Sequence, residues 1–206
     1  MNKIYLVVAI GVMAIMIGSL NGAIYYNKYY TEKEPCSALK LVGEANIGGK
    51  FNLIDENNNF VSEREVIDKP SLIYFGYTFC PDICPLDAVR NAEAVDLLST
   101  KGFELKPIFV TIDPDRDTPE VLRDFTDAIH PQMLGLTGSV KQIKAISQAY
   151  RTYYRKQVSE DEYYLVDHST FSYLVTPKKG FVDFFRRDET ALKIAEKIAC
   201  HLKDNL

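Results

Sequence analysis

The sequence predicts one domain of the α/β class, and three observations support this prediction. From Ser71 onward, short apolar segments rich in β-forming residues alternate with longer segments of helical periodicity. One such pair is the apolar run 72–75, which Gly76 ends, and a helical pattern that starts near Pro85. About 165 of the 206 residues remain once an apolar N-terminal segment is set aside, which is enough for one domain with one core.

The apolar N-terminal segment has the length of a membrane span. No residue between Lys3 and Lys28 is charged. As a helix of about 23 residues it would be about 34 Å long, and the hydrocarbon layer of a membrane is about 30 Å thick. A cluster of tyrosines at the far end of the segment resembles the aromatic residues that gather at membrane interfaces. We therefore expect a single transmembrane helix.

Three parts are expected along the chain. Residues 1–30 form the membrane anchor, residues 31–40 a short polar tether, and residues 41–206 the folded domain. A cleaved signal peptide is the alternative for residues 1–30. The sequence has no clear A-x-A-like cleavage site after the apolar core, which favours the anchor. Under both interpretations the rest of the chain is exported.

The domain is expected to begin with a β-hairpin and to continue with a β/α alternation. An Asn-rich turn at residues 57–59 separates the two strands of the hairpin, and the strands that follow are buried apolar runs. A turn with proline and glycine at residues 177–180 joins a second hairpin near the end of the chain. The expected strands cover residues 51–54, 60–61, 72–75, 105–112, 171–175 and 181–185.

Helices are expected between and after these strands. The first begins at Pro85 and continues over residues 86–98, because proline lacks the N–H that the first helical turn leaves unpaired. The second begins at Pro119 behind a threonine N-cap, and the third follows Ser139 as N-cap, with apolar residues at helical spacing. The last helix covers residues 190–202.

The loop after the strand 72–75 carries two cysteines, Cys80 and Cys84. A strand, a loop with two thiols and a helix form the site of thioredoxin-like proteins, although the spacing here is C-x3-C instead of C-x2-C. The wider loop allows both sulfurs to face one soft cation or to close a disulfide. Because Cys84 stands at the start of a helix, the helix dipole should favour its thiolate. A structural disulfide or an inert buried pair is the alternative.

Three motifs in order carry a resemblance to a known family. They are FGYTFCPDICP at residues 75–85, DPDRDTP at residues 113–119 and VDHS at residues 166–169. With these motifs the sequence resembles the Sco/SenC family of copper chaperones for cytochrome c oxidase, over residues 41–202. The resemblance implies a thioredoxin-like fold with an added N-terminal β-hairpin.

The resemblance also implies a set of metal ligands. Cys80, Cys84 and His168 match the three copper ligands of the family, so one copper ion per chain, as Cu(I), Cu(II) or both, is expected. Two thiolates and an imidazole suit copper, whereas a structural zinc site takes one ligand more. Without the resemblance, His168 would be a lone histidine, which is more often structural or at the surface. Asp167 beside it is a candidate acceptor for a ring N–H, although the side chain of an adjacent residue often points the other way.

Other polar residues allow further interpretations. His130 and His201 stand near helix ends and are expected to face solvent instead of adding a fourth ligand. Asp113, Arg116 and Asp117 lie at the carboxyl edge of the predicted sheet, where they either cap the turn and the helix or contact a partner.

The remaining cysteines, Cys36 and Cys200, stand at the two ends of the expected domain. The ends of a domain often come close together, so an oxidising compartment could join these residues in a disulfide. Two unpaired thiols are the alternative.

The net charge of the chain and its resemblance to the Sco/SenC family together reduce the number of possible functions. A net charge of −4 without a long basic run argues against a nucleic-acid partner. The resemblance implies a copper-binding metallochaperone that assists assembly of the dinuclear copper centre of cytochrome c oxidase. Its partners would be the copper-bearing subunit of the oxidase and an upstream periplasmic copper donor. With the expected anchor, the chain would be a single-pass protein of a bacterial inner membrane with its domain in the periplasm.

Thiol enzymes are the alternatives. A membrane-anchored thiol-disulfide oxidoreductase would use Cys80 and Cys84 to reduce the cysteines of the oxidase's copper site. A peroxidase-type enzyme would need a proton shuttle or an arginine near its thiol, which the loop does not show. His168 separates the main interpretations, because a copper site needs it and a reductase does not. Thiol-disulfide reduction is therefore the one enzymatic activity that the sequence leaves open.

Overall fold

The computed structural model of the protein describes residues 3–30, 47–158 and 163–203. The chain divides into two compact units, residues 1–37 and 38–206. In the first unit, helix α1 covers Lys3–Tyr30. Within the described residues, no helix combines the length and the apolar character that a membrane crossing requires. The transmembrane anchor therefore stays a prediction, and the tether at residues 31–40 lies outside the described residues.

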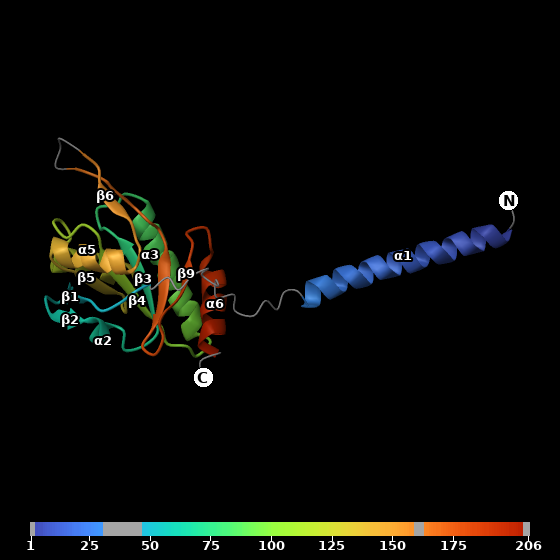
Figure 1. Cartoon of the computed structure of the whole chain (residues 1–206), viewed down its shortest axis with the longest axis horizontal. Coiled ribbons are helices and arrows are strands. Elements are labelled where there is room, and N and C mark those ends of the chain that lie inside the picture. The colour runs from blue at the N-terminus through green and yellow to red at the C-terminus, as the bar shows by residue number, and fades with distance from the viewer. Residues whose placement is uncertain (1–2, 31–46, 159–162, 204–206) are drawn as a thin grey trace. The chain divides into compact units, whose positions relative to one another are not determined.

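The second unit contains a central mixed sheet (Figure 1). The strands are β1 (Asn52–Asp55), β2 (Phe60–Ser62), β3 (Ser71–Gly76), β4 (Lys106–Thr111), β5 (Leu134–Thr137), β6 (Tyr154–Lys156), β7 (Val166–His168), β8 (Ser172–Thr176) and β9 (Gly180–Phe185). Among the described residues, seven of these strands form a sheet in the order β2-β1-β5-β4-β3-β8-β9, and β6 and β7 form a separate two-stranded sheet. The candidate ligands Cys80 and Cys84 follow β3 of the larger sheet, whereas His168 is the last residue of β7 in the smaller one.

The pairing of the strands explains the α/β class. Strands β3, β4 and β5 run parallel, which requires a helical connection after each of the first two, whereas β8 lies antiparallel to β3 and forms a hairpin with β9. The predicted N-terminal hairpin is present as β1 and β2, and β1 joins it to the sheet edge at β5. Strand β5 itself was not predicted. It is short and contains Gly135, where an added Cβ would lie 2.9 Å from the carboxylate of Glu56.

The four predicted helices are present in the predicted order, and the short helix α2 was not predicted. They are α2 (Glu63–Val66), α3 (Ile83–Ser99), α4 (Pro119–Ile129), α5 (Val140–Ala149) and α6 (Ala191–Lys203). The N-caps of α4 and α5 are those predicted, because the side chains of Thr118 and Ser139 accept backbone N–H bonds from the first turns. The predicted start of α3 is wrong by two residues. Asp82 is its N-cap, so Pro85 stands at the third helical position.

Strand β3 is buried on both faces of the sheet. Leu72 packs into a cluster with apolar residues of α3 and α6, and Tyr74 reaches Asp87 of α3. Phe75 points to the opposite face, where its ring centre lies 5.4 Å from that of Tyr150 at the end of α5. Figure 1 shows α5 and α6 at opposite sides of the sheet. A strand held from both sides is a rigid support for the loop at its carboxyl end.

Candidate metal centre

The cysteine loop leaves β3 at Gly76, a position that only glycine fits. A Cβ at Gly76 would lie 2.9 Å from the ring of Tyr74 and 3.0 Å from that of Phe109. The loop then enters α3, so Cys84 lies in the first helical turn and is fully buried, while Cys80 is partly exposed. The backbone N–H of Cys84 donates to Sγ of Cys80 at 3.4 Å. The start of α3 therefore holds the Cys80 sulfur with a backbone donor.

His168 comes from the two-stranded sheet. It is the last residue of β7, and the strand pair beside β3 begins only at Ser172. Nε2 of His168 lies 3.2 Å from Sγ of Cys84. Nδ1 lies 2.8 Å from the carbonyl oxygen of Ser169. Because a carbonyl oxygen only accepts, Nδ1 carries the ring hydrogen, and Nε2 of the neutral ring keeps a lone pair that faces Cys84.

Asp167 does not orient the ring of His168. Its carboxylate accepts a hydrogen bond from the side chain of Gln157 at 2.7 Å and lies 3.4 Å from the guanidinium of Arg155. The expected role is therefore wrong, because successive side chains of a strand point to opposite faces. The carbonyl of Ser169 takes that role instead. Sequence reasoning missed this contact, since a backbone acceptor leaves no signal in residue type.

The ring of His168 is also held by two aromatic side chains. It meets Tyr74 and Tyr77 edge to face, with ring centres 6.3 Å and 5.9 Å away. The hydroxyl of Tyr77 accepts a hydrogen bond from the backbone N–H of Val166 at 3.3 Å, which ties β7 to the cysteine loop. Burial raises the pKa of Tyr77 to about 12, so its hydroxyl is neutral at physiological pH.

The structure brings the three predicted ligand atoms together. The sulfurs of Cys80 and Cys84 and a ring nitrogen of His168 lie within 4.8 Å of one another. Among the described residues, no other group of three or more His, Cys, Asp or Glu side chains is arranged to hold a metal ion. An adjoining pocket of about 350 Å³ is lined by Cys80, His168 and Leu165, among others, and gives access to the site.

The pKa values of the two thiols are shifted in opposite directions. The hydrogen bond from the Cys84 thiol lowers the pKa of Cys80 to about 4, and backbone N–H groups at the start of α3 act in the same direction. The same hydrogen bond, together with burial, raises the pKa of Cys84. The expectation that the helix start would activate Cys84 is therefore wrong. Since α3 begins two residues earlier than predicted, its free N–H groups face the Cys80 sulfur.

A polar cluster lies behind Cys84. Tyr74, buried in β3, donates its hydroxyl to Asp87 of α3 at 3.0 Å. Asp87 also lies 3.5 Å from Arg90 and 3.5 Å from Arg187. Burial raises the pKa of Asp87, and the two arginines oppose that effect. Sequence reasoning missed this cluster, although the alternation along β3 places Tyr74 on the side of α3.

The acidic residues after β4 form hydrogen bonds with other residues of the chain. Asp117 is fully buried and accepts hydrogen bonds from the hydroxyls of Thr78 and Thr111, each at 2.6 Å. Asp113, also fully buried, accepts from Arg116 at 2.6 Å. Of the two interpretations, the structure favours the internal one, because these carboxylates fasten the loop after β4 and, through Thr78, the cysteine loop.

The other histidines do not join the site. His130 is 8% exposed and its ring lies 3.2 Å from the carboxylate of Asp96. His201 is 6% exposed and its ring lies 2.9 Å from Asp183. The expectation that both face solvent is wrong, because each has an acidic neighbour from another element. Cys200 is disulfide-bonded, but its predicted partner Cys36 lies outside the described residues, so the pairing stays a prediction.

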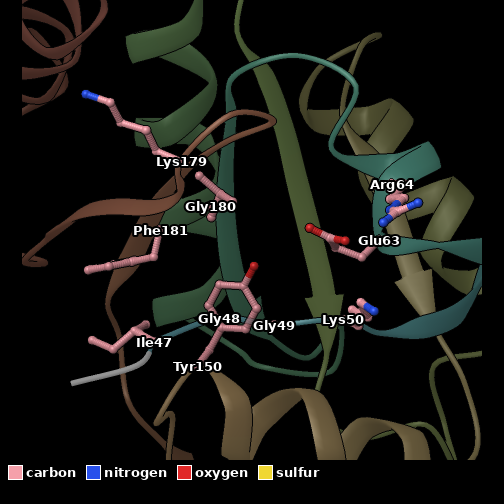
Figure 2. Close-up of a pocket in the computed structure, with 11 residues that line it drawn as sticks. Ile47, Gly48, Gly49, Lys50, Glu63, Arg64, Tyr150, Lys179, Gly180 and Phe181 are labelled. Carbon is pink, nitrogen blue, oxygen red and sulfur yellow. The ribbon is translucent and has the colours of Figure 1, made fainter. Parts of the chain in front are cut away.

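A second pocket lies away from the three donors. It has a volume of about 430 Å³ and includes Gly48, Glu63 and Tyr150 in its wall. In Figure 2 the hydroxyl of Tyr150 and the carboxylate of Glu63 both point into it. Gly48 has φ +83° and lies against the Tyr150 ring, a conformation that favours glycine. None of the residues that line this pocket is a cysteine or a histidine, so it is separate from the metal centre.

The donor set suits copper. Two sulfurs and one imidazole nitrogen combine soft donors, which favour Cu(I), with a borderline donor that also suits Cu(II). The bare lone pair of Nε2 and the thiolate of Cys80 are the forms of these side chains that bind metal. The residues therefore fit a copper ion, and with three donors they fit a closed tetrahedral zinc site less well.

Comparison with known proteins gives related sequences and structures. A family model described as SCO1/SenC matches residues 40–203. Protein SenC of Rhodobacter capsulatus is 52% identical over 158 residues, which cover 77% of this chain and 72% of that protein. The crystal structure of Arabidopsis thaliana ScoI with copper bound matches with a TM-score of 0.74 at 36% identity, over 77% of this chain and 99% of that one.

Yeast Sco1 with copper bound is a further match. Its crystal structure has a TM-score of 0.72 at 39% identity, over 78% of this chain and 90% of that one. The shared architecture confirms the predicted thioredoxin-like α/β fold of the domain. The sequence motifs did not indicate three features of the site. These are the contact of His168 with the carbonyl of Ser169, the Tyr74–Asp87 pair, and the separate two-stranded sheet that contains His168.

Proposed function

The chain belongs to the SCO1/SenC family, and we propose that it is a copper-binding metallochaperone that assists assembly of the dinuclear copper centre of cytochrome c oxidase. The observation that carries the proposal is the 3.2 Å separation of Cys84 Sγ from Nε2 of His168, beside a Cys80 sulfur that a backbone N–H holds. Copper is the cargo of this protein and not a catalytic cofactor. The proposed ligands are Cys80, Cys84 and His168, with one ion per chain.

Each proposed ligand has a distinct task. Cys80 offers a thiolate at neutral pH and is partly exposed, so it is the residue that first meets an incoming ion. Cys84 is buried and protonated, so its thiol must release a proton when its sulfur becomes a ligand. His168 presents Nε2 while Ser169 holds Nδ1, which fixes the ring plane without a carboxylate. Binding is thus coupled to pH and to the reduced state of both thiols.

The partners and the location are part of the same proposal. An upstream periplasmic copper donor would load the site, and the copper-bearing subunit of the oxidase would receive the ion. The uncharged stretch between Lys3 and Lys28 supports a single-pass anchor in a bacterial inner membrane, with the domain in the periplasm. The partly exposed Cys80 and the open pocket beside it support direct transfer to a partner's ligands.

One observation favours a second candidate, a thiol-disulfide oxidoreductase. A thiolate at Cys80 and a nearby protonated thiol at Cys84 are the pair that disulfide exchange needs. Cys80 would attack a partner's disulfide, which releases one partner sulfur and leaves the other in a mixed disulfide with Cys80. Cys84 would then attack the sulfur of Cys80, form the Cys80–Cys84 disulfide and release the second partner sulfur. Two electrons and two protons pass to the partner, whose two sulfurs leave as thiols, and Cys80 and Cys84 become a disulfide. His168 has no required part in these steps.

Copper binding by the reduced protein tests the proposal. Anaerobic titration of the reduced full chain should give one copper per chain, for Cu(I) by competition with a chromophoric chelator and for Cu(II) by its thiolate absorption. Cys80→Ser and Cys84→Ser should each abolish tight binding. His130→Gln is the matched control, because that ring pairs with Asp96 outside the site. If wild-type protein binds neither ion, the chaperone proposal fails, and disulfide reduction becomes the function to test.

A further inference from the structure

His168 does not belong to the seven-stranded sheet that supports the cysteines. Its strand β7 pairs with β6, so that Tyr154 lies opposite His168 and Lys156 lies opposite Val166. We call this two-stranded sheet, with Tyr164 just before β7, the histidine hairpin. The distance from Nε2 of His168 to the sulfurs depends on what holds the histidine hairpin against the rest of the domain.

Two side chains of the histidine hairpin bind one buried carboxylate. The hydroxyl of Tyr164 donates to Oδ1 of Asp113 at 2.8 Å, and Nζ of Lys156 lies 3.0 Å from the same oxygen. Lys156 also donates to the Tyr164 hydroxyl at 3.2 Å and pairs with Asp115. The side chain of Asp113 is 0% exposed. Bonds between a buried carboxylate and a cation are stronger than those at an open surface.

Arg116 extends these contacts to the cysteine loop. Its Nε donates to the other oxygen of Asp113 at 2.6 Å. Its guanidinium lies 3.7 Å from the ring centre of Tyr164 and 4.8 Å from that of Phe79. Phe79 directly precedes Cys80. Cation–π contacts on both rings thus connect the histidine hairpin to the residue next to the first proposed ligand.

We propose that Lys156 and Tyr164 are positioning residues of the metal site: by binding Asp113 they hold the histidine hairpin so that His168 stands beside Cys84. The inference rests on the proposed copper function and extends it to residues that supply no donor atom. Cu(I) is bound mainly by the two sulfurs, whereas Cu(II) depends more on the imidazole. Loosening the hairpin therefore weakens Cu(II) binding more than Cu(I) binding, and Lys156 and Tyr164 set that preference.

The double variant Lys156→Met, Tyr164→Phe tests the proposal. It removes the ammonium and the hydroxyl but keeps the alkyl stem and the ring over Arg116. Its matched control is Lys144→Met, Tyr153→Phe, which removes the same groups at exposed positions. In the reduced full chain we expect a loss of about 10–100-fold in Cu(II) affinity and a changed Cu(II)–thiolate absorption, as for residues that orient a ligand. Cu(I) affinity should fall less than about threefold, and Lys156→Arg should retain most Cu(II) binding.

A second measurement does not need copper. The backbone N–H of Val166 donates to the hydroxyl of Tyr77, so its hydrogen exchange reports whether the hairpin is seated. In the metal-free double variant this exchange should be faster than in the control. A Cu(II) affinity equal to that of the control overturns the proposal, and so do equal losses for both copper ions, which a general loss of stability would cause. If wild-type protein binds no copper, the proposed function fails, and the exchange at Val166 alone decides whether Lys156 and Tyr164 hold the hairpin.

Discussion

Nε2 of His168 and Sγ of Cys84 lie 3.2 Å apart, although 84 positions separate the two residues in the chain. The contact joins a residue of a small separate sheet to the first turn of α3. It therefore distinguishes a three-donor metal site from a simple dithiol. The two proposed functions make different demands on this contact, because copper uses the imidazole and disulfide exchange does not.

His168→Ala separates the two functions. The variant should keep part of the Cu(I) affinity through Cys80 and Cys84, because two thiolates suit that ion. Its Cu(II) affinity should fall by more than 100-fold, since removing a ligand costs more than removing a residue that orients it. A pure reductase would keep its rate toward a disulfide substrate. The affinities are measured by copper titration of the His168→Ala protein, and oxidase assembly is measured in cells that carry this variant. Wild-type copper affinities together with wild-type oxidase assembly would contradict the three-ligand copper site.

The low pKa of Cys80 predicts an unusual pH profile of thiol alkylation. In the reduced, metal-free protein, the rate of iodoacetamide reaction at Cys80 should stay nearly constant from pH 8 to pH 6, because its pKa of about 4 keeps the thiolate there. An ordinary thiol slows about 100-fold over that range, given a pKa near 8.5. Peptide mapping identifies the alkylated cysteine. In Cys84→Ala, which has no side-chain donor, the profile should move toward that of an ordinary thiol.

The same shift has a consequence for stability. The folded pKa of Cys80 is lower than that of an unfolded thiol, about 8.5, so the group stabilises the reduced fold above that pH. This contribution is lost as the pH falls toward 4. The raised pKa of Cys84 has the opposite sign, since its contribution is present below the unfolded pKa and is lost as the pH rises. The urea midpoint of the reduced protein, measured as a function of pH, tests this assignment. A midpoint that falls neither toward pH 4 nor above pH 8.5 would contradict it.

The motifs predicted the donors but not their support. Cys80 and Cys84 were predictable because a strand, a dithiol loop and a helix leave a clear pattern, and His168 because it stands in a family motif. The pKa shifts of the two thiols were not predictable, since they depend first on the hydrogen bond between the thiols and then on burial and on a helix start two residues earlier than predicted. The acceptor of the His168 ring is the carbonyl of Ser169, and backbone acceptors have no signature in a sequence.

The fold shows a similar division. The strands with long apolar runs, such as β3 and β4, were predicted because burial on both faces leaves a continuous signal. Strand β5 was missed because it has four residues and one of them is Gly135, which the close approach of Leu122 and Glu56 requires. Strands β6 and β7 have three residues each, too few for a period to be recognised.

The proposed topology can be tested with fusions. Alkaline phosphatase placed after Leu206 should be active, because the enzyme folds in the periplasm, where its disulfides form. The expectation rests on the uncharged segment between Lys3 and Lys28. A cytoplasmic reporter at the same position is the control and should be inactive. The reverse pattern would place the domain on the other side of the membrane and contradict the proposed location.

The predicted disulfide between Cys36 and Cys200 should stabilise the domain. Linking the two ends would restrict the unfolded chain and contribute about 2–4 kcal/mol to the free energy of unfolding. Mass mapping of protein isolated without reductant should show the two cysteine-containing peptides joined. Cys36→Ser and Cys200→Ser should lower the urea midpoint by the same amount, since either change removes the same bond. Free thiols at both positions in periplasmic protein would refute the pairing.

Tyr74→Phe tests the polar cluster behind Cys84. The hydroxyl of Tyr74 is the 3.0 Å donor to Asp87, and both side chains are buried. Its loss leaves a buried carboxylate with one bond fewer, so we expect the free energy of unfolding to fall by about 1–3 kcal/mol. Tyr153→Phe, which removes a hydroxyl from a residue 55% exposed, should change it by less than about 0.5 kcal/mol. Urea unfolding of the reduced protein measures both, and equal midpoints would show that Arg90 and Arg187 satisfy Asp87 without the tyrosine.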